Sequence, residues 1–193
     1  MVELPVGEWA EALVKFILDN FQPALDFIAE VVDGFGGSIN TALTSVPDWL
    51  IVAIFVGLAL WRVGIGFALF TLASLLLIMS MDLWAEMVST LGLVIAATIF
   101  SLVFGIPLGI MASRNAAFEG VVKTMLDFMQ TMPAFVYLIP AVMFFGLGRV
   151  PGIIATVIFA MPPAVRLTSL GIKQVPVEIV EAVTVQLRRV MQP

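Results

Sequence analysis

The chain has 193 residues, of which 61% are apolar and only 12% are charged. Ordinary soluble domains have about 45–50% apolar and about 25% charged residues, and the mean hydropathy of this chain is +1.12. The composition therefore excludes a soluble enzyme. Histidine and cysteine are both absent, which excludes imidazole and thiolate catalysis, disulfides and the common zinc sites.

Residues 1–48 form an acidic region with eight acidic side chains and a single basic one. Residues 8–20 have helical apolar periodicity, and a second periodic stretch opens near Pro23. Three glycines, Gly34, Gly36 and Gly37, predict that this second helix ends there. We expect residues 1–46 to form amphipathic helices that either pack on the rest of the protein or lie in the membrane interface.

After Pro47 the chain consists of long uncharged stretches separated by charged or interfacial residues. A helix needs about 20 residues to cross ~30 Å of hydrocarbon. We therefore predict an all-α, polytopic membrane protein with about five transmembrane helices in residues 47–171. In the fifth of them, Arg166 must snorkel to the interface or face protein. The predicted spans are residues 47–61, 63–81, 87–112, 125–148 and 150–171.

The basic residues predict the orientation, because Lys and Arg are enriched on the cytoplasmic side of membrane proteins. If the acidic N-terminal region lies outside, Arg149 is the one basic residue after Pro47 that falls outside with it. The 172–193 segment is then cytoplasmic. The basic residues on the cytoplasmic side are Arg62, Arg114, Lys123, Lys173, Arg188 and Arg189.

Small residues recur at a spacing of four within the third predicted span. Gly105 and Gly109 form a GxxxG motif, and Gly92 and Ala96 are a second small pair. Lipid offers apolar surface as readily as protein does, so close backbone approach must supply the attraction between membrane helices. Both pairs therefore predict helix–helix contacts.

Prolines are expected to interrupt the last two predicted spans, Pro133 and Pro140 in the fourth and Pro162-Pro163 in the fifth. Each proline removes a backbone hydrogen bond, and protein or water must satisfy the freed carbonyl. The breaks indicate helices that are buried against partners or that line a wet path. A merely kinked bundle explains them equally well.

The segment 126–182 carries the most specific sequence signal. It reads LDFMQTMPAFVYLIP from Leu126 to Pro140, PPAVRLT at 162–168, GIKQVP at 171–176 and EIVEA at 178–182. This segment resembles the permease subunit of bacterial glycine betaine/proline betaine ABC importers, which belong to the binding-protein-dependent transport family. The resemblance extends back through GIPLGI at 105–110 and implies the fold of a type I ABC importer permease.

The resemblance implies a homodimer in the bacterial inner membrane, with the N-terminus outside. It implies an ABC ATPase subunit on the cytoplasmic face and an extracytoplasmic binding protein that delivers the betaine. ATP hydrolysis then belongs to the ATPase, so the chain itself is not expected to be an enzyme. We expect no cofactor and no metal, and no nucleic acid as a partner. Besides these protein partners, the chain is expected to contact membrane lipid.

The quaternary ammonium of a betaine cannot donate hydrogen bonds, so aromatic faces are its natural partners. Candidate residues of the substrate pathway are therefore Met132, Pro133, Phe135 and Tyr137, which surround the expected break. The alternative is that these aromatic side chains only pack against neighbouring helices.

The coupling helix of the family, which docks on the ATPase, begins with Glu-Ala-Ala. Here Glu178, Glu181 and Ala182 are the candidate coupling residues, but Val183 stands where the second Ala belongs and Leu187 where a Gly belongs. The two spans expected after this helix do not follow before Pro193. The resemblance therefore implies a permease truncated at its C-terminus.

Two functions stay open on the sequence: the permease subunit of an osmolyte importer, or a non-transporting remnant or assembly partner that keeps the permease scaffold. An intramembrane enzyme is a distant third. Without His or Cys it would need a carboxylate pair inside the bilayer, and Asp82, Glu86 and Asp127 lie at span ends instead.

Overall fold

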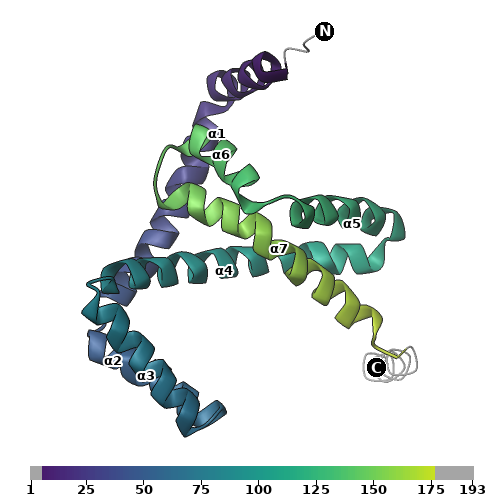
Figure 1. Ribbon diagram of the computed structural model, residues 1–193. Helices are drawn as coiled ribbons and strands as arrows, with labels where there is room; N and C mark the ends of the chain where they lie inside the picture. The colour runs from purple at the N-terminus through teal and green to yellow at the C-terminus, as the bar shows by residue number, and fades with distance from the viewer. Residues whose placement is uncertain (1–5, 177–193) are drawn as a thin grey trace, which may run out of the picture. The chain divides into compact units, whose positions relative to one another are not determined.

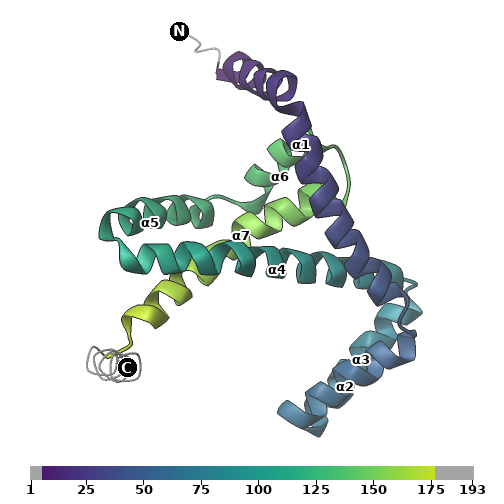
Figure 2. The ribbon, with the colours of Figure 1, turned by 180° about the vertical axis from the view of Figure 1, so that it is seen from behind.

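The computed structural model describes residues 6–176, and this part of the chain is all α-helical. Figure 1 shows the helices in chain order, and Figure 2 shows them from behind. The helices are α1 (Val6–Thr44), α2 (Asp48–Arg62), α3 (Ile65–Ser80), α4 (Trp84–Arg114), α5 (Ala116–Thr131), α6 (Ala134–Phe145) and α7 (Arg149–Lys173). The predicted all-α class is confirmed.

The chain divides into two compact units. In the described part, unit 1 comprises residues 6–97 and 138–154, and unit 2 comprises residues 98–137 and 155–176. The helices α4, α6 and α7 each contribute residues to both units.

In unit 1, α1 is kinked at Phe21, whose φ of −119° and ψ of 15° are not helical. The kink lies two residues before Pro23, which has no N–H to donate and whose ring crowds the preceding turn. The helix then continues to Thr44. The prediction that Gly34, Gly36 and Gly37 end it is therefore wrong.

The reason is a close contact between the glycines of α1 and the first residues of α7. A Cβ added at Gly36 would lie 2.6 Å from Ile153 Cδ1, and one at Gly37 would lie 3.2 Å from Arg149 Nη1. Arg149 also pairs with Asp33 at 3.4 Å. A helical glycine costs about 1 kcal/mol relative to alanine, and we attribute the survival of the helix to this packing, which offsets that cost.

The helices α2 and α3 lie side by side in unit 1 (Figures 1 and 2). Gly64 connects them with a φ of 121°, a conformation that residues with a side chain rarely adopt. At the start of α4, Trp84 Nε1 donates a hydrogen bond to Asp48 Oδ1 at 2.6 Å, which ties α4 to the start of α2. The small pair of α4 also makes the predicted contact, since Gly92 lies against Asn40 of α1.

In unit 2 the GxxxG motif of α4 packs against α7. An added Cβ would lie 2.8 Å from Ala164 Cβ at Gly105, and 2.6 Å from Thr168 Cβ at Gly109. Real Cβ atoms do not approach this closely, so only glycine permits the observed separation of the two helices. The predicted helix–helix contact is confirmed.

Three of the prolines do not interrupt their helices as predicted. Pro140 lies inside α6, and Pro162 and Pro163 lie inside the continuous α7. Pro162 is fully buried, and Met161 and Ala164 on either side of the pair face Gly105 of α4. Proline weakens a helix by removing one hydrogen bond, but neighbouring helices can hold the backbone in place.

By length and composition, α4 and α7 are each able to cross a membrane, among the described residues. Two more spans result if the pairs α1 with α2 and α5 with α6 each count as one bent span. The helix α3 is apolar but has only 16 residues, about 24 Å at 1.5 Å each. The helices thus give two to four candidate spans, and the boundaries of the five spans stay a prediction.

Candidate functional site

The break between α5 and α6 lies where Pro133 predicts it. The helix α5 ends at Thr131, and Met132 is extended, with φ −90° and ψ 139°. A residue before proline is forced out of the helical region, because its backbone would clash with the proline ring. Pro133 also has no N–H for the carbonyl four residues earlier. The sequence therefore ends the helix at this point.

A hydrogen-bond cluster at the Phe128 carbonyl closes the end of α5. This carbonyl accepts bonds from the Tyr137 hydroxyl at 3.0 Å and the Thr131 hydroxyl at 3.2 Å. It also accepts a weaker one from the Met132 N–H at 3.4 Å. The last carbonyls of a helix have no partner within it. Tyr137, from the first turn of α6, therefore supplies a cap that holds the two sides of the break together.

The structure brings all four candidate pathway residues to this break. Pro133 and Phe135 are exposed, with 73% of Phe135 accessible, while Met132 is less so and Tyr137 is half-buried. The hydroxyl of Tyr137 is already engaged by the Phe128 carbonyl. Sequence reasoning did not foresee this bond, because its partners are nine residues apart and meet only where the helix is broken.

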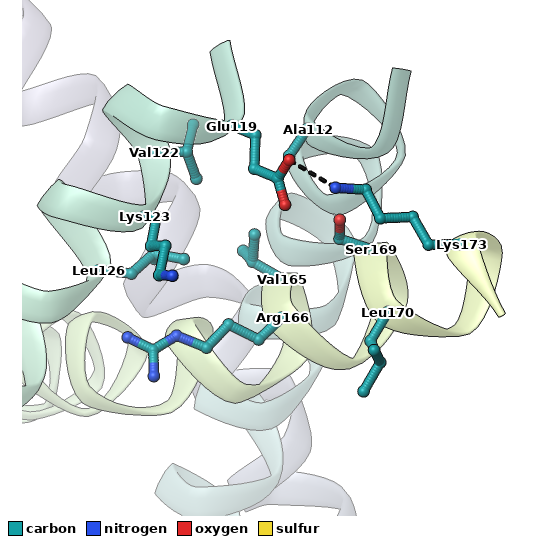
Figure 3. Close-up of a pocket in the computed structure, with 10 residues that line it drawn as sticks. All are labelled: Ala112, Glu119, Val122, Lys123, Leu126, Val165, Arg166, Ser169, Leu170 and Lys173. Carbon is teal, nitrogen blue, oxygen red and sulfur yellow. Dashed lines mark hydrogen bonds and ion pairs between the residues drawn. The ribbon is translucent and has the colours of Figure 1, made fainter. Parts of the chain in front are cut away.

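A pocket of about 220 Å³ opens in unit 2 between the end of α4, one face of α5 and the second half of α7. Asn115 starts α5 by accepting hydrogen bonds from the N–H groups of Ala117 and Phe118, a standard helix cap. The apolar floor and the charged rim of the pocket are drawn in Figure 3. The lining residues are Ala112, Glu119, Val122, Lys123, Leu126, Val165, Arg166, Ser169, Leu170 and Lys173.

Two ion pairs join α5 to α7 beside this pocket. Lys173 Nζ pairs with Glu119 at 2.5 Å, drawn as a dashed line in Figure 3, and Arg166 pairs with Asp127, also at 2.5 Å. The predicted alternatives for Arg166 were snorkelling or facing protein. The Arg166 guanidinium faces protein, because it pairs with the Asp127 carboxylate. This pair neutralises the charge of Arg166 within the predicted fifth span.

The candidate coupling residues Glu178, Glu181 and Ala182 lie outside the described residues. Within residues 6–176 there is no group of three acidic side chains placed to hold a metal ion. The sequence predicts only that Lys123 is cytoplasmic, and it predicts no site that includes Ser169. A signal was available, because Glu119, Lys123 and Asp127 recur every four residues and so share one face of α5.

The sequence profile of the family described as "Binding-protein-dependent transport system inner membrane component" matches residues 105–186. The chain is 45% identical to the glycine betaine/carnitine transport permease protein of Listeria monocytogenes. It is 46% identical to the glycine betaine transport system permease protein of Bacillus subtilis. It is 38% identical to the glycine betaine/proline betaine transport system permease protein of Escherichia coli.

Each of these similarities covers 93% of this chain. The chain spans 64% of the length of the first two relatives and 51% of the third. The profile match includes the α4 GxxxG motif, the broken α5–α6 segment and α7. The chain is thus similar to binding-protein-dependent transport inner-membrane components over residues 105–186, and to glycine betaine permeases over most of its length.

Proposed function

We propose that this chain acts as the membrane-spanning permease subunit of an ABC importer for quaternary ammonium osmolytes such as glycine betaine and proline betaine. The observation that carries this proposal is the identity of 45% and 46%, over 93% of the chain, with two glycine betaine permeases. The family description adds a binding protein as partner. A separate ATPase would supply the energy, and the permease would act as a homodimer.

The proposal is tested by betaine uptake in cells that lack other betaine importers. The gene is expressed together with its ATPase and binding protein, and uptake of radiolabelled glycine betaine is measured at high osmolarity. We expect uptake that unlabelled proline betaine inhibits and that an ATPase-inactive partner abolishes. Uptake no greater than in cells without the permease gene, with the protein present in the membrane, would contradict the proposal.

We further propose that the N-terminal region lies outside the cytoplasm. The distribution of Lys and Arg supports this orientation. The ion pair between Arg149 and Asp33 is consistent with it, because the one basic residue after Pro47 that is placed outside finds its partner in the acidic N-terminal helix. The Trp84–Asp48 hydrogen bond likewise joins two segments that this orientation places on the outer side.

Single cysteines test the orientation directly, since the natural chain has none. Ser38→Cys is expected to react with a membrane-impermeant thiol reagent in intact cells, and Asn115→Cys only after the cells are opened. The measurement is labelling of the purified protein, with the cysteine-free chain as control. Labelling of Asn115→Cys alone in intact cells would reverse the orientation.

We propose that the break at Pro133 borders the substrate pathway. Exposed Phe135 and Met132 are the side chains that a passing betaine would contact, since an aromatic face attracts a quaternary ammonium. Pro133 would keep the segment open, and Tyr137 would hold it in shape through its bond to the Phe128 carbonyl. Glu178, Glu181 and Ala182 are proposed to contact the ATPase.

A further inference from the structure

The pocket of unit 2 contains a cation and a hydroxyl that have no partner in the described part of the chain. These are Lys123 on α5 and Ser169 on α7 (Figure 3). Along the chain, Lys123 lies between Glu119 and Asp127, and Ser169 lies between Arg166 and Lys173. These four neighbours form the two ion pairs that join α5 to α7.

Lys123 leaves the pocket with an excess of positive charge. On the same face of α5, Glu119 is paired with Lys173 and Asp127 with Arg166, which uses both carboxylates. Lys123 lies one helical turn from each of them and forms no ion pair among residues 6–176. Three cations therefore face two carboxylates, and one positive charge is uncompensated.

Ser169 lacks a local bond that several hydroxyls on the described helices make. These hydroxyls donate a hydrogen bond to the carbonyl four residues earlier, the usual local bond of a serine or threonine inside a helix. The Ser169 hydroxyl is without a hydrogen-bond partner although the residue is only 8% exposed. The hydroxyls with the ordinary bond include Ser38, Thr44, Thr71, Ser74, Thr90 and Thr124.

The close packing of α4 explains this difference. The carbonyl that Ser169 would normally use is that of Val165, and an added Cβ at Gly109 would lie only 2.7 Å from its oxygen. The backbone of α4 thus occupies the approach to this carbonyl. Ser169 instead lines the pocket from the side of α7 that also carries Lys173, and its buried hydroxyl is directed toward the Glu119–Lys173 pair (Figure 3).

We propose that this pocket binds a phosphate group, with Lys123 supplying the charge and Ser169 a buried hydrogen bond. A phosphate has several acceptor oxygens and so suits a site with several donors. A betaine does not suit it, because its quaternary ammonium would lie beside Lys123, Arg166 and Lys173. The proposal goes beyond the transport function and does not depend on it.

The phosphate could belong to an anionic lipid headgroup or be free in solution. Apolar side chains beside the charged rim, Val122, Leu126 and Leu170, would contact the glycerol of a lipid, whereas free phosphate needs only the polar groups. The experiment therefore uses both probes. The ligands are inorganic phosphate and short-chain phosphatidylglycerol, with sodium chloride at matched ionic strength as the control.

The measurement is the thermal unfolding midpoint of the purified full chain in detergent, titrated with each probe, because a ligand of the native state raises this midpoint. We expect Lys123→Gln and Ser169→Ala each to weaken the apparent affinity about tenfold, as for a lost bond to a charged group. The matched controls are Arg114→Gln, which removes a nearby charge outside the pocket, and Ser113→Ala, which removes a hydroxyl bonded to the Ile110 carbonyl. Both controls are expected to bind as the natural chain does.

Stabilisation by both probes assigns the site to phosphate as such, and stabilisation by the lipid alone assigns it to a headgroup. Either result supports the proposal when Lys123→Gln reduces it. A response no greater than that to sodium chloride would overturn the proposal, and so would equal binding by Lys123→Gln and the natural chain. Lys123 is exposed, so this variant is expected to fold even if Ser169→Ala does not.

Discussion

Gly109→Ala is expected to destabilise unit 2 by about 3 kcal/mol, the upper part of the usual range for overpacking. The added Cβ would lie 2.6 Å from Thr168 Cβ and 2.7 Å from the Val165 carbonyl oxygen. The second of these atoms belongs to the backbone of α7 and cannot move without displacing the helix. The measurement is the free energy of unfolding of the purified protein, titrated with a denaturing detergent.

Gly105→Ala can be compared with Gly109→Ala, because a second substitution is expected to restore stability only to Gly105→Ala. Its added Cβ would lie 2.8 Å from Ala164 Cβ, while the nearest backbone atoms are 3.5 Å or more away. Removing that one side-chain atom with Ala164→Gly should therefore restore the contact, apart from about 1 kcal/mol for the new helical glycine. Thr168→Gly should not rescue Gly109→Ala, because the Val165 carbonyl remains in place.

Gly120→Ala is the matched control, since nothing lies within 4 Å of its added Cβ. Here the substitution should stabilise α5 by up to about 1 kcal/mol, the usual preference of a helix for alanine. A similar loss of stability in all three glycine variants would contradict the packing argument. It would show that these glycines act through backbone flexibility and not through the separation of α4 from α7.

The α4–α7 contact shows which part of the fold the sequence could predict. Two glycines four residues apart are a local pattern, so the presence of a helix contact was predictable from residues 105–109 alone. Its partner was not singled out, although Ala164 and Thr168 have the same spacing and are also small. The neighbouring prolines suggested a break in α7, and a broken helix would not present a continuous face.

The glycines of α1 show where local reasoning fails. A cluster of Gly34, Gly36 and Gly37 lowers helix propensity, and propensity is the only information that the local sequence offers. The contact that sustains the helix comes from Arg149 and Ile153, more than 110 residues later in the chain. Such long-range packing overrides propensity but leaves no trace within the segment itself.

At the candidate site, too, the sequence could predict the local feature but not the contacts between helices. Pro133 ends α5 through its own ring and its missing N–H, so the break follows from one residue. The cap by Tyr137 and the free hydroxyl of Ser169 depend on distances between helices. The ion pairs could not be predicted, because the sequence is compatible with several pairings between the charged residues of α5 and those of α7.

If the chain acts as the proposed betaine permease, Pro133→Ala is expected to reduce betaine uptake at least about tenfold while the amount of protein in the membrane stays near normal. Alanine restores the N–H that proline lacks and removes the steric restriction on Met132, so α5 can continue into α6. In a continuous helix, Tyr137 would lie about 13 Å along the axis from Phe128, beyond the reach of its hydroxyl. The Tyr137–Phe128 bond therefore exists only while the segment is broken.

Spin labels at Met125 and Val136, both exposed, provide a structural measurement for the same variant. In a continuous helix these positions are separated by about 16 Å of rise, and the Pro133→Ala distance should move to that expected for helix. Tyr137→Phe, which keeps Pro133 but removes the hydroxyl, should broaden the distance distribution without straightening the segment. If Pro133→Ala straightens the helix and uptake is unchanged, the break serves only to bend the chain and does not border the pathway.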